Sequence, residues 1–211
     1  MGRIAELAAV TLALALTACA AAPRPCPTAV ACEGGVCHAG RCGAVDDVPV
    51  SVGARRVVLE AVATRASDDD ARFAPTLGGA GASPTLVVRF APAWGRGRVE
   101  RALLVLSPAP GALATPARTT ITVARALEPW SVTSAPPRVG PVEATATVTF
   151  APPRAIRIDV TDAVREWART GEAHHGFVIR ASGDDARGAS FAIEAGEAPR
   201  LDVYVATDKP R

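Results

Sequence analysis

The stretch Thr145-Ala146-Thr147-Val148-Thr149-Phe150 alternates threonine with an apolar residue, so the two kinds of side chain fall on opposite faces of an extended chain. The same period of two recurs near the C-terminus, where polar residues separate Leu201, Val203 and Val205. Such alternation needs one buried and one solvated face, as in an antiparallel sheet. Short apolar runs between Pro, Gly and Asp clusters extend from about residue 48 to residue 207 and predict an all-β sandwich.

The expected strands follow one another at short intervals along this region. They cover residues 56–64, 85–91, 101–107, 120–126, 144–150, 155–160, 176–181, 190–194 and 200–206.

One segment, Asp159–Gly171, breaks the β pattern and predicts a single short helix. Val160, Val164 and Trp167 fall at positions i, i+4 and i+7, on one helical face. The aspartate that opens the segment, or Thr161, can cap the helix, and the glycine that closes it is a stop signal. We expect the helix to pack its tryptophan over an open end of the sandwich.

The N-terminus has the pattern of an export signal. Met1-Gly2-Arg3 precedes an apolar run from Leu7 to Leu16, which is shorter than the roughly 20 residues of a membrane-spanning helix. The sequence Leu16-Thr17-Ala18-Cys19 resembles a bacterial lipobox. The resemblance implies that Cys19 is diacylated and becomes the first mature residue; an ordinary cleaved signal is the alternative. The non-acidic Ala20 implies, by the same resemblance, an outer-membrane location in a Gram-negative bacterium.

A cysteine-rich segment follows the proposed lipid site. Cys26, Cys32, Cys37 and Cys42 have the spacing C-x5-C-x4-C-x4-C. An even number of cysteines in an exported, glycine-rich segment favours two disulfides, with three pairings open. A zinc site that includes His38 is the alternative, although paired C-x2-C units are absent from the sequence. The predicted organisation is therefore a signal peptide (residues 1–18), a lipid-anchored, disulfide-rich linker (19–48) and a β-sandwich domain (49–207).

Charge and composition exclude one class of partner. The chain has 23 Lys and Arg against 21 Asp and Glu, a formal net charge of +2. Nucleic-acid binding needs a concentrated basic face, so we expect no nucleic-acid partner. With 49% hydrophobic but only 4% aromatic residues, the core must consist mainly of aliphatic side chains.

Several stretches of the C-terminal region, among them Val123–Trp130 and Gly176–Ile179, resemble a known family. Leu86-Val87-Val88-Arg89-Phe90 and the run from Val99 to Leu106 resemble the paired strands of DNRLRE domains. Arg157–Trp167 resembles their D-V-T-x-x-V-x-x-W helix, and Pro199–Val205 resembles their closing strand. The order and spacing are similar over roughly residues 55–206. The resemblance implies a jelly-roll β-sandwich in envelope-attached proteins, some of whose relatives are carbohydrate-binding modules.

Candidate ligand-binding residues lie in one Gly/Pro loop. Trp94 can stack on a sugar ring, and Arg96 and Arg98 can pair with the carboxylate of an acidic sugar. An ordinary loop tryptophan is the alternative. Trp130 and Trp167 are expected in the core or as loop anchors.

Candidate metal ligands are less specific. Asp68, Asp69 and Asp70 have the oxygen donors that a structural calcium ion prefers, as does the pair Asp184-Asp185. Solvated loop charge is the alternative in both places. His174-His175 can bind a metal or titrate near neutral pH, the alternative being a surface loop. No other cofactor is expected.

Motifs for catalysis are absent from the sequence: it has no G-x-S-x-G, H-E-x-x-H or P-loop pattern. We therefore expect a non-catalytic envelope lipoprotein, attached to the membrane through its lipid, whose β-sandwich makes structural or adhesive contacts at the cell surface with matrix, cell wall or a partner protein. The first alternative is a carbohydrate-binding module for a polysaccharide, and a polysaccharide hydrolase or lyase is a further one.

Overall fold

The computed structural model describes residues 35–38, 41–44, 49–66, 76–77, 85–91, 93–109, 118–149, 155–171, 174–182, 189–193 and 196–206. The predictions for Cys19, Cys26 and Cys32, and those for Asp68–Asp70 and Asp184-Asp185, lie outside these residues.

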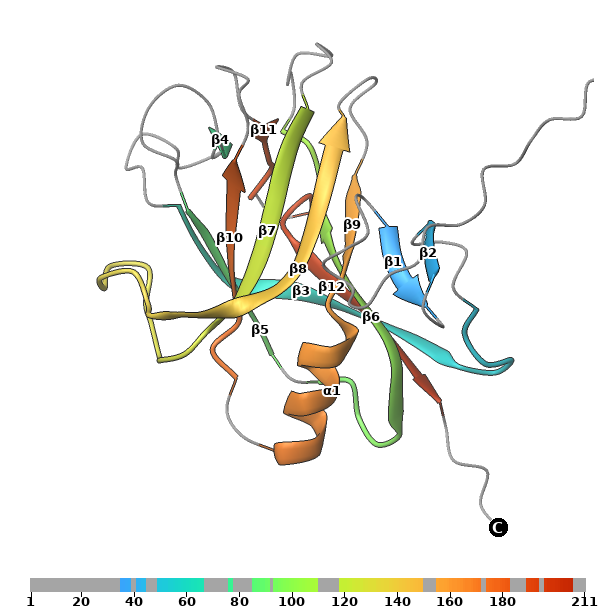
Figure 1. The fold of residues 1–211 in the computed structure, drawn as a ribbon. Coiled ribbons are helices and arrows are strands. Elements are labelled where there is room, and N and C mark those ends of the chain that lie inside the picture. The colour runs from blue at the N-terminus through green and yellow to red at the C-terminus, as the bar shows by residue number, and fades with distance from the viewer. Residues whose placement is uncertain are drawn as a thin grey trace, which may run out of the picture.

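Eight strands form one antiparallel sheet (Figure 1). Their order is β8 (Val139–Thr149), β7 (Arg118–Ala126), β10 (Phe177–Ser182), β5 (Leu86–Phe90), β3 (Arg55–Ala66), β12 (Arg200–Ala206), β6 (Arg98–Leu106) and β9 (Ile156–Asp159). Two small sheets accompany it, the hairpin of β1 (Gly35–His38) with β2 (Arg41–Ala44) and the pair of β4 (Thr76–Leu77) with β11 (Ala189–Ser190).

The long strand β3 folds this sheet into two layers. Its first half pairs with β12, and its second half pairs with β5 after a register shift between Ala61 and Ala63. One layer is thus β8-β7-β10-β5 with the second half of β3, and the other is the first half of β3 with β12-β6-β9. The outermost strands β8 and β9 contact each other. The predicted all-β sandwich with one short helix is confirmed.

The core lies between the two layers. It contains the fully buried Phe90, Phe177 and Phe191, surrounded by aliphatic side chains such as Leu104 and Leu201. Burial of each such side chain contributes about 1.5–3 kcal/mol relative to exposure. The aliphatic composition of the chain therefore accounts for most of the packing.

In β12 the burial expected from the alternating pattern is met on the inward face but not at Asp202 on the outward face. Leu201, Val203 and Val205 are fully buried, as predicted. Asp202, on the opposite face, is also fully buried, although alternation predicts a solvated residue there. The carboxylate is covered because arginines from neighbouring strands gather on it, as described below.

The helix α1 (Thr161–Thr170) packs against β6 at one end of the sandwich (Figure 1). The Asp159 carboxylate accepts the N–H of Thr161 at 2.8 Å, so it satisfies one free donor of the first turn. The Thr161 hydroxyl does not cap the helix; it accepts the N–H of Ala102 on β6 at 2.9 Å. Gly171 ends the helix in the left-handed conformation, with φ of 65°.

The hairpin of β1 and β2 lies beside the edge strand β9 (Figure 1). Its register is regular from Gly35–Ala44 to His38–Arg41. Among the residues that the structure describes, no helix is long and apolar enough to cross a bilayer.

Candidate functional site

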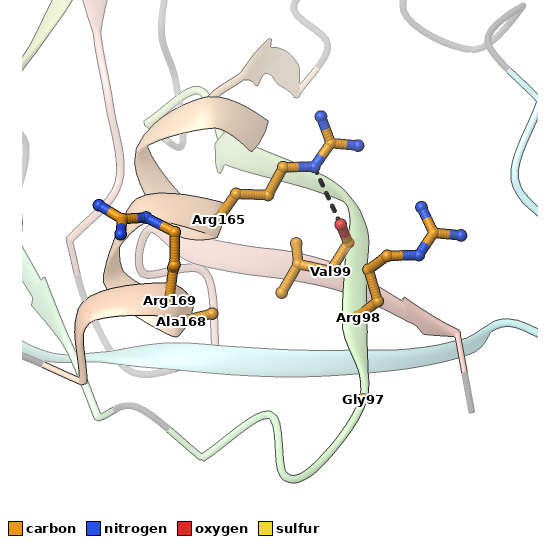
Figure 2. A pocket seen from close by; sticks show the side chains of 6 residues that line it. All are labelled: Gly97, Arg98, Val99, Arg165, Ala168 and Arg169. Carbon is orange, nitrogen blue, oxygen red and sulfur yellow. Dashed lines mark hydrogen bonds between the residues drawn. The ribbon is translucent and has the colours of Figure 1, made fainter. Parts of the chain in front are cut away.

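A shallow groove of about 310 Å³ lies between the start of β6 and the helix α1 (Figure 2). Three of its lining residues are arginines, and each of them has a carboxylate partner nearby. The lining residues are Gly97, Arg98, Val99, Arg165, Ala168 and Arg169.

Arg165 joins the helix to the strand across this groove. Its Nε donates to the Val99 carbonyl at 3.0 Å, and one of its terminal nitrogens donates to the Glu100 carbonyl at 2.6 Å. Its other terminal nitrogen lies 3.4 Å from the Asp162 carboxylate. Arg165 therefore positions α1 on β6 and also places a positive charge at the groove.

Arg98 lines the groove on the strand side. It pairs with the Glu100 carboxylate at 2.9 Å, and that carboxylate also accepts the hydroxyl and the N–H of Ser51. The hydrogen bonds from Ser51 lower the pKa of Glu100, and the charges of Arg98 and Arg165 act in the same direction. Glu100 is thus a fixed anion that orients the Arg98 side chain.

Arg169 lines the groove with its stem, while its guanidinium turns away from Arg98 (Figure 2). The guanidinium pairs with Glu166 one turn earlier in the helix, at 2.6 Å. The hydrogen bond from Arg169 is the main cause that lowers the pKa of Glu166.

Arg98 keeps guanidinium donors for a ligand. Arg98 is 68% exposed, and its ion pair with Glu100 uses one of the five N–H donors of a guanidinium. An exposed guanidinium can take a carboxylate or a phosphate with two parallel hydrogen bonds. The groove is therefore suited chemically to an anionic group.

The expectation that Trp94 lies exposed is wrong. Its ring is only 7% exposed, and its carbonyl accepts a guanidinium N–H of Arg55 at 2.9 Å. No face of this ring is open to a sugar, so the stacking role predicted for Trp94 has no geometric basis. Arg96, from the same predicted site, is exposed, and Arg98 lines the groove.

His174 lies between two tryptophan rings. Trp167 stacks on it with ring centroids 4.4 Å apart, and Trp94 lies 6.0 Å away on a nearly parallel plane. Both ring nitrogens of His174 are buried without a hydrogen-bond partner among the described residues. Desolvation lowers the pKa of His174, and the electrostatic interactions with His175 and Arg89 lower it further. The imidazole is thus held neutral, as part of the aromatic packing.

Trp130 is also buried, as predicted for a loop anchor. Its Nε1 donates to the His175 carbonyl at 2.6 Å, and the Arg89 guanidinium lies 5.5 Å from the centre of the ring system. It packs with Val87 and Val178 on the outer side of the β5-β10 layer. The three tryptophans therefore serve packing rather than a stacking surface.

A second basic cluster surrounds Asp202. Its carboxylate contacts Arg56 at 2.7 Å, Arg157 at 3.6 Å and Arg200 at 3.5 Å. These residues come from β3, β9 and β12, so the cluster ties three strands of one layer. The arrangement is structural, because the carboxylate lies beneath the guanidinium groups and is not exposed to solvent.

The structure offers no metal site within the part of the chain that it describes, since no three His, Cys, Asp or Glu side chains gather there. The predicted calcium ligands Asp68, Asp69 and Asp70 lie outside that part. His174 and His175 are not directed to a common ion, because the ring of His174 is enclosed by tryptophans.

Sequence reasoning missed the contribution of the helix to the groove. Arg165 and Arg169 are spaced by one helical turn, and this spacing places both on one side of α1. The sequence therefore contained the spacing that places both arginines on one side of the helix. What the sequence does not contain is the placement of that side next to Arg98, which depends on the packing of α1 against β6.

Comparisons with known proteins do not assign a family. No protein-family model matches the chain, and no curated protein is significantly similar to it.

Proposed function

We propose that this protein is a non-catalytic envelope lipoprotein, anchored in the outer membrane of a Gram-negative bacterium through an acylated Cys19. Its β-sandwich, which we propose to be a DNRLRE-like module, makes structural or adhesive contacts at the cell surface. The lipobox-like sequence before Cys19 supports the anchor. The arginine-lined groove supports the contact, because it presents exposed guanidinium groups on a rigid sheet and helix. We infer that the partner is acidic.

The lowered pKa values of three glutamates favour a binding function over a catalytic one. Hydrogen bonds from Ser51, Arg138 and Arg169 lower the pKa values of Glu100, Glu128 and Glu166, respectively. A general acid at neutral pH needs the opposite shift, since it must hold its proton near pH 7. These three glutamates are therefore anions that orient arginines.

An acidic polysaccharide is the second candidate partner. The exposed guanidinium of Arg98 at the groove suits a carboxylate of a charged glycan. A neutral polysaccharide is disfavoured, because the tryptophans that would stack on its sugar rings are buried.

A binding assay with one matched control tests the contact site. Arg98→Gln removes the exposed groove charge, and we expect at least about a tenfold loss of affinity for an acidic partner, since a charged hydrogen bond contributes about 1.5–3 kcal/mol. Arg138→Gln is the control, because Arg138 has a comparable ion pair with Glu128 but lies outside the groove. The two polysaccharide probes are polygalacturonate and neutral dextran, and a cell-surface protein extract is the third.

The outcomes separate the hypotheses. Binding to polygalacturonate that Arg98→Gln weakens favours the acidic-polysaccharide function. Binding only to surface proteins, again weakened by Arg98→Gln, favours the adhesive function. If Arg98→Gln and Arg138→Gln bind every partner equally well, the groove is not the contact site.

The lipid anchor has its own test. Cells that express the protein are labelled with a radioactive fatty acid, and Cys19→Ala is compared with the unchanged chain. We expect label in the unchanged chain only. A chain that acquires no label would contradict the proposed anchor.

A further inference from the structure

The hairpin of β1 and β2 brings two cysteines opposite each other. Its antiparallel register pairs Cys37 with Cys42 and His38 with Arg41. Only two residues separate the strands in the sequence, so the His38–Arg41 pair is the one next to the turn.

The pattern of a two-residue hairpin defines the kind of position that the cysteines occupy. The pair beside the loop exchanges both backbone hydrogen bonds, so the next pair, Cys37 with Cys42, is a non-hydrogen-bonded pair. The Cα atoms of such pairs lie about 4.5 Å apart, and disulfides join Cα atoms at about 4.4–6.8 Å. The backbone therefore brings the two residues into bridging range without rearrangement.

We propose that a disulfide joins Cys37 to Cys42 across the hairpin and that a second joins Cys26 to Cys32. Four cysteines allow three pairings, and only one of them contains the Cys37–Cys42 bond. Cys19 then remains as the odd cysteine, which agrees with its proposed use as the lipid site. This assignment does not depend on the groove or on its partner.

The bond forms by thiol–disulfide exchange with an oxidised disulfide-carrying protein in an oxidising compartment outside the cytoplasm. The Cys37 thiolate attacks one sulfur of that donor and forms a mixed disulfide, releasing one donor thiolate. The Cys42 thiolate then attacks the Cys37 sulfur and releases the second donor thiolate. The two cysteines lose two electrons and two protons, and the donor is reduced to its dithiol. The bond between Cys26 and Cys32 forms in the same way.

The crosslink has a physical role in this place. A two-stranded hairpin is marginally stable on its own, and the short strand β9 lies beside the hairpin here. A disulfide between directly opposed residues fixes the strand register, which backbone pairing alone would leave free to slip. The hairpin of β1 and β2 is thereby held in one register.

Peptide mapping of the full lipoprotein tests the pairing. The protein is extracted in detergent at low pH, free thiols are alkylated, and the chain is cut without reduction by trypsin and a glutamate-specific protease. Cleavage after Glu33, Arg41 and Arg55 puts Cys37 in one peptide and Cys42 in the next. Cys26 and Cys32 stay together in the peptide that ends at Glu33.

The three pairings give different products. The proposed pairing joins the Cys37 peptide to the Cys42 peptide and leaves the Cys26–Cys32 peptide separate, with an internal bond. Either other pairing joins all three peptides into one product and overturns the proposal. Alkylated Cys37 and Cys42 in the native protein would overturn it as well, and would favour the zinc alternative.

A single variant gives an independent measurement. In Cys37→Ser, we expect Cys42 to become the alkylated residue, while Cys26 and Cys32 remain bonded. Alkylation of Cys26 or Cys32 in this variant would contradict the assignment. Cys26→Ser is the matched control and should expose Cys32 only.

Discussion

Trp167 stacks on His174, with ring centroids 4.4 Å apart and an angle of 17° between the ring planes. The pair links the last turns of α1 to the segment that leads into β10. Trp167 also contacts Phe177, the first residue of β10, at a centroid distance of 4.8 Å. The helix is thus held on the sandwich by aromatic contacts as well as by the hydrogen bonds of Arg165.

Trp167→Ala should destabilise the fold by about 3–5 kcal/mol, because it removes a large buried side chain and leaves a cavity beneath the helix. Denaturant unfolding measures the loss. Val132→Ala is the control, since Val132 is 60% exposed and should change stability little. A near-neutral Trp167→Ala would mean that the ring does not pack as described.

Acid should weaken the fold through His174. Burial lowers the pKa of this imidazole below the ordinary value of about 6.5, so the unfolded chain takes up a proton before the folded chain does. The stability that the neutral imidazole contributes is therefore complete above about pH 6.5 and is lost as the pH falls from there towards the folded-state pKa.

His174→Phe should remove this part of the pH dependence, since phenylalanine keeps the stacking and cannot be protonated. The measurement is the free energy of unfolding between pH 7.5 and pH 5. Val132→Ala is the control, because Val132 is exposed and does not titrate, so this variant should keep the slope of the unchanged protein. An unchanged slope in His174→Phe would show that other groups cause the acid sensitivity.

Much of the fold was predictable because local patterns and global packing agree. The spacing of Val160, Val164 and Trp167 predicts the helix, and all three are buried in it or at its start. Each predicted strand overlaps an observed one. The boundaries differ most at β8, which begins at Val139 rather than near Ala144, because pairing with β7 continues past residues that show no alternation.

The site was less predictable, because its residues meet only through tertiary packing. Trp94 lies in a Gly/Pro-rich loop whose composition favours exposure, yet the contacts with His174 and Arg55 bury it. Asp202 follows a pattern that predicts solvent contact, but arginines of neighbouring strands enclose it. In both cases the deciding partners are distant in the sequence, where a period of two or a loop composition gives no information.

Gly176→Ala should destabilise the fold strongly. Gly176 has φ of 90°, and a Cβ there would collide with the carbonyl of Val88 in the neighbouring strand. Left-handed backbone costs about 1–2 kcal/mol for alanine, and overpacking adds about 1–3 kcal/mol. Thermal unfolding should therefore show a much larger loss than for Gly171→Ala, whose Cβ would meet open space at φ of 65°. Equal losses in the two variants would show that backbone strain alone matters and that the close approach to Val88 does not.

Asp202→Asn should destabilise the protein by about 1.5–3 kcal/mol, the usual contribution of hydrogen bonds to a charged group, because the arginines left behind are partly exposed and can be solvated. The substitution keeps the shape of the side chain but leaves Arg56, Arg157 and Arg200 without their shared carboxylate. Asp162→Asn is the matched control, because that carboxylate is 88% exposed and its pair with Arg165 is open to solvent. Denaturant unfolding of both variants at pH 7 measures the difference. If Asp202→Asn is as stable as Asp162→Asn, the arginines hold the three strands without the buried charge, and the cluster is not an ion-pair network in energetic terms.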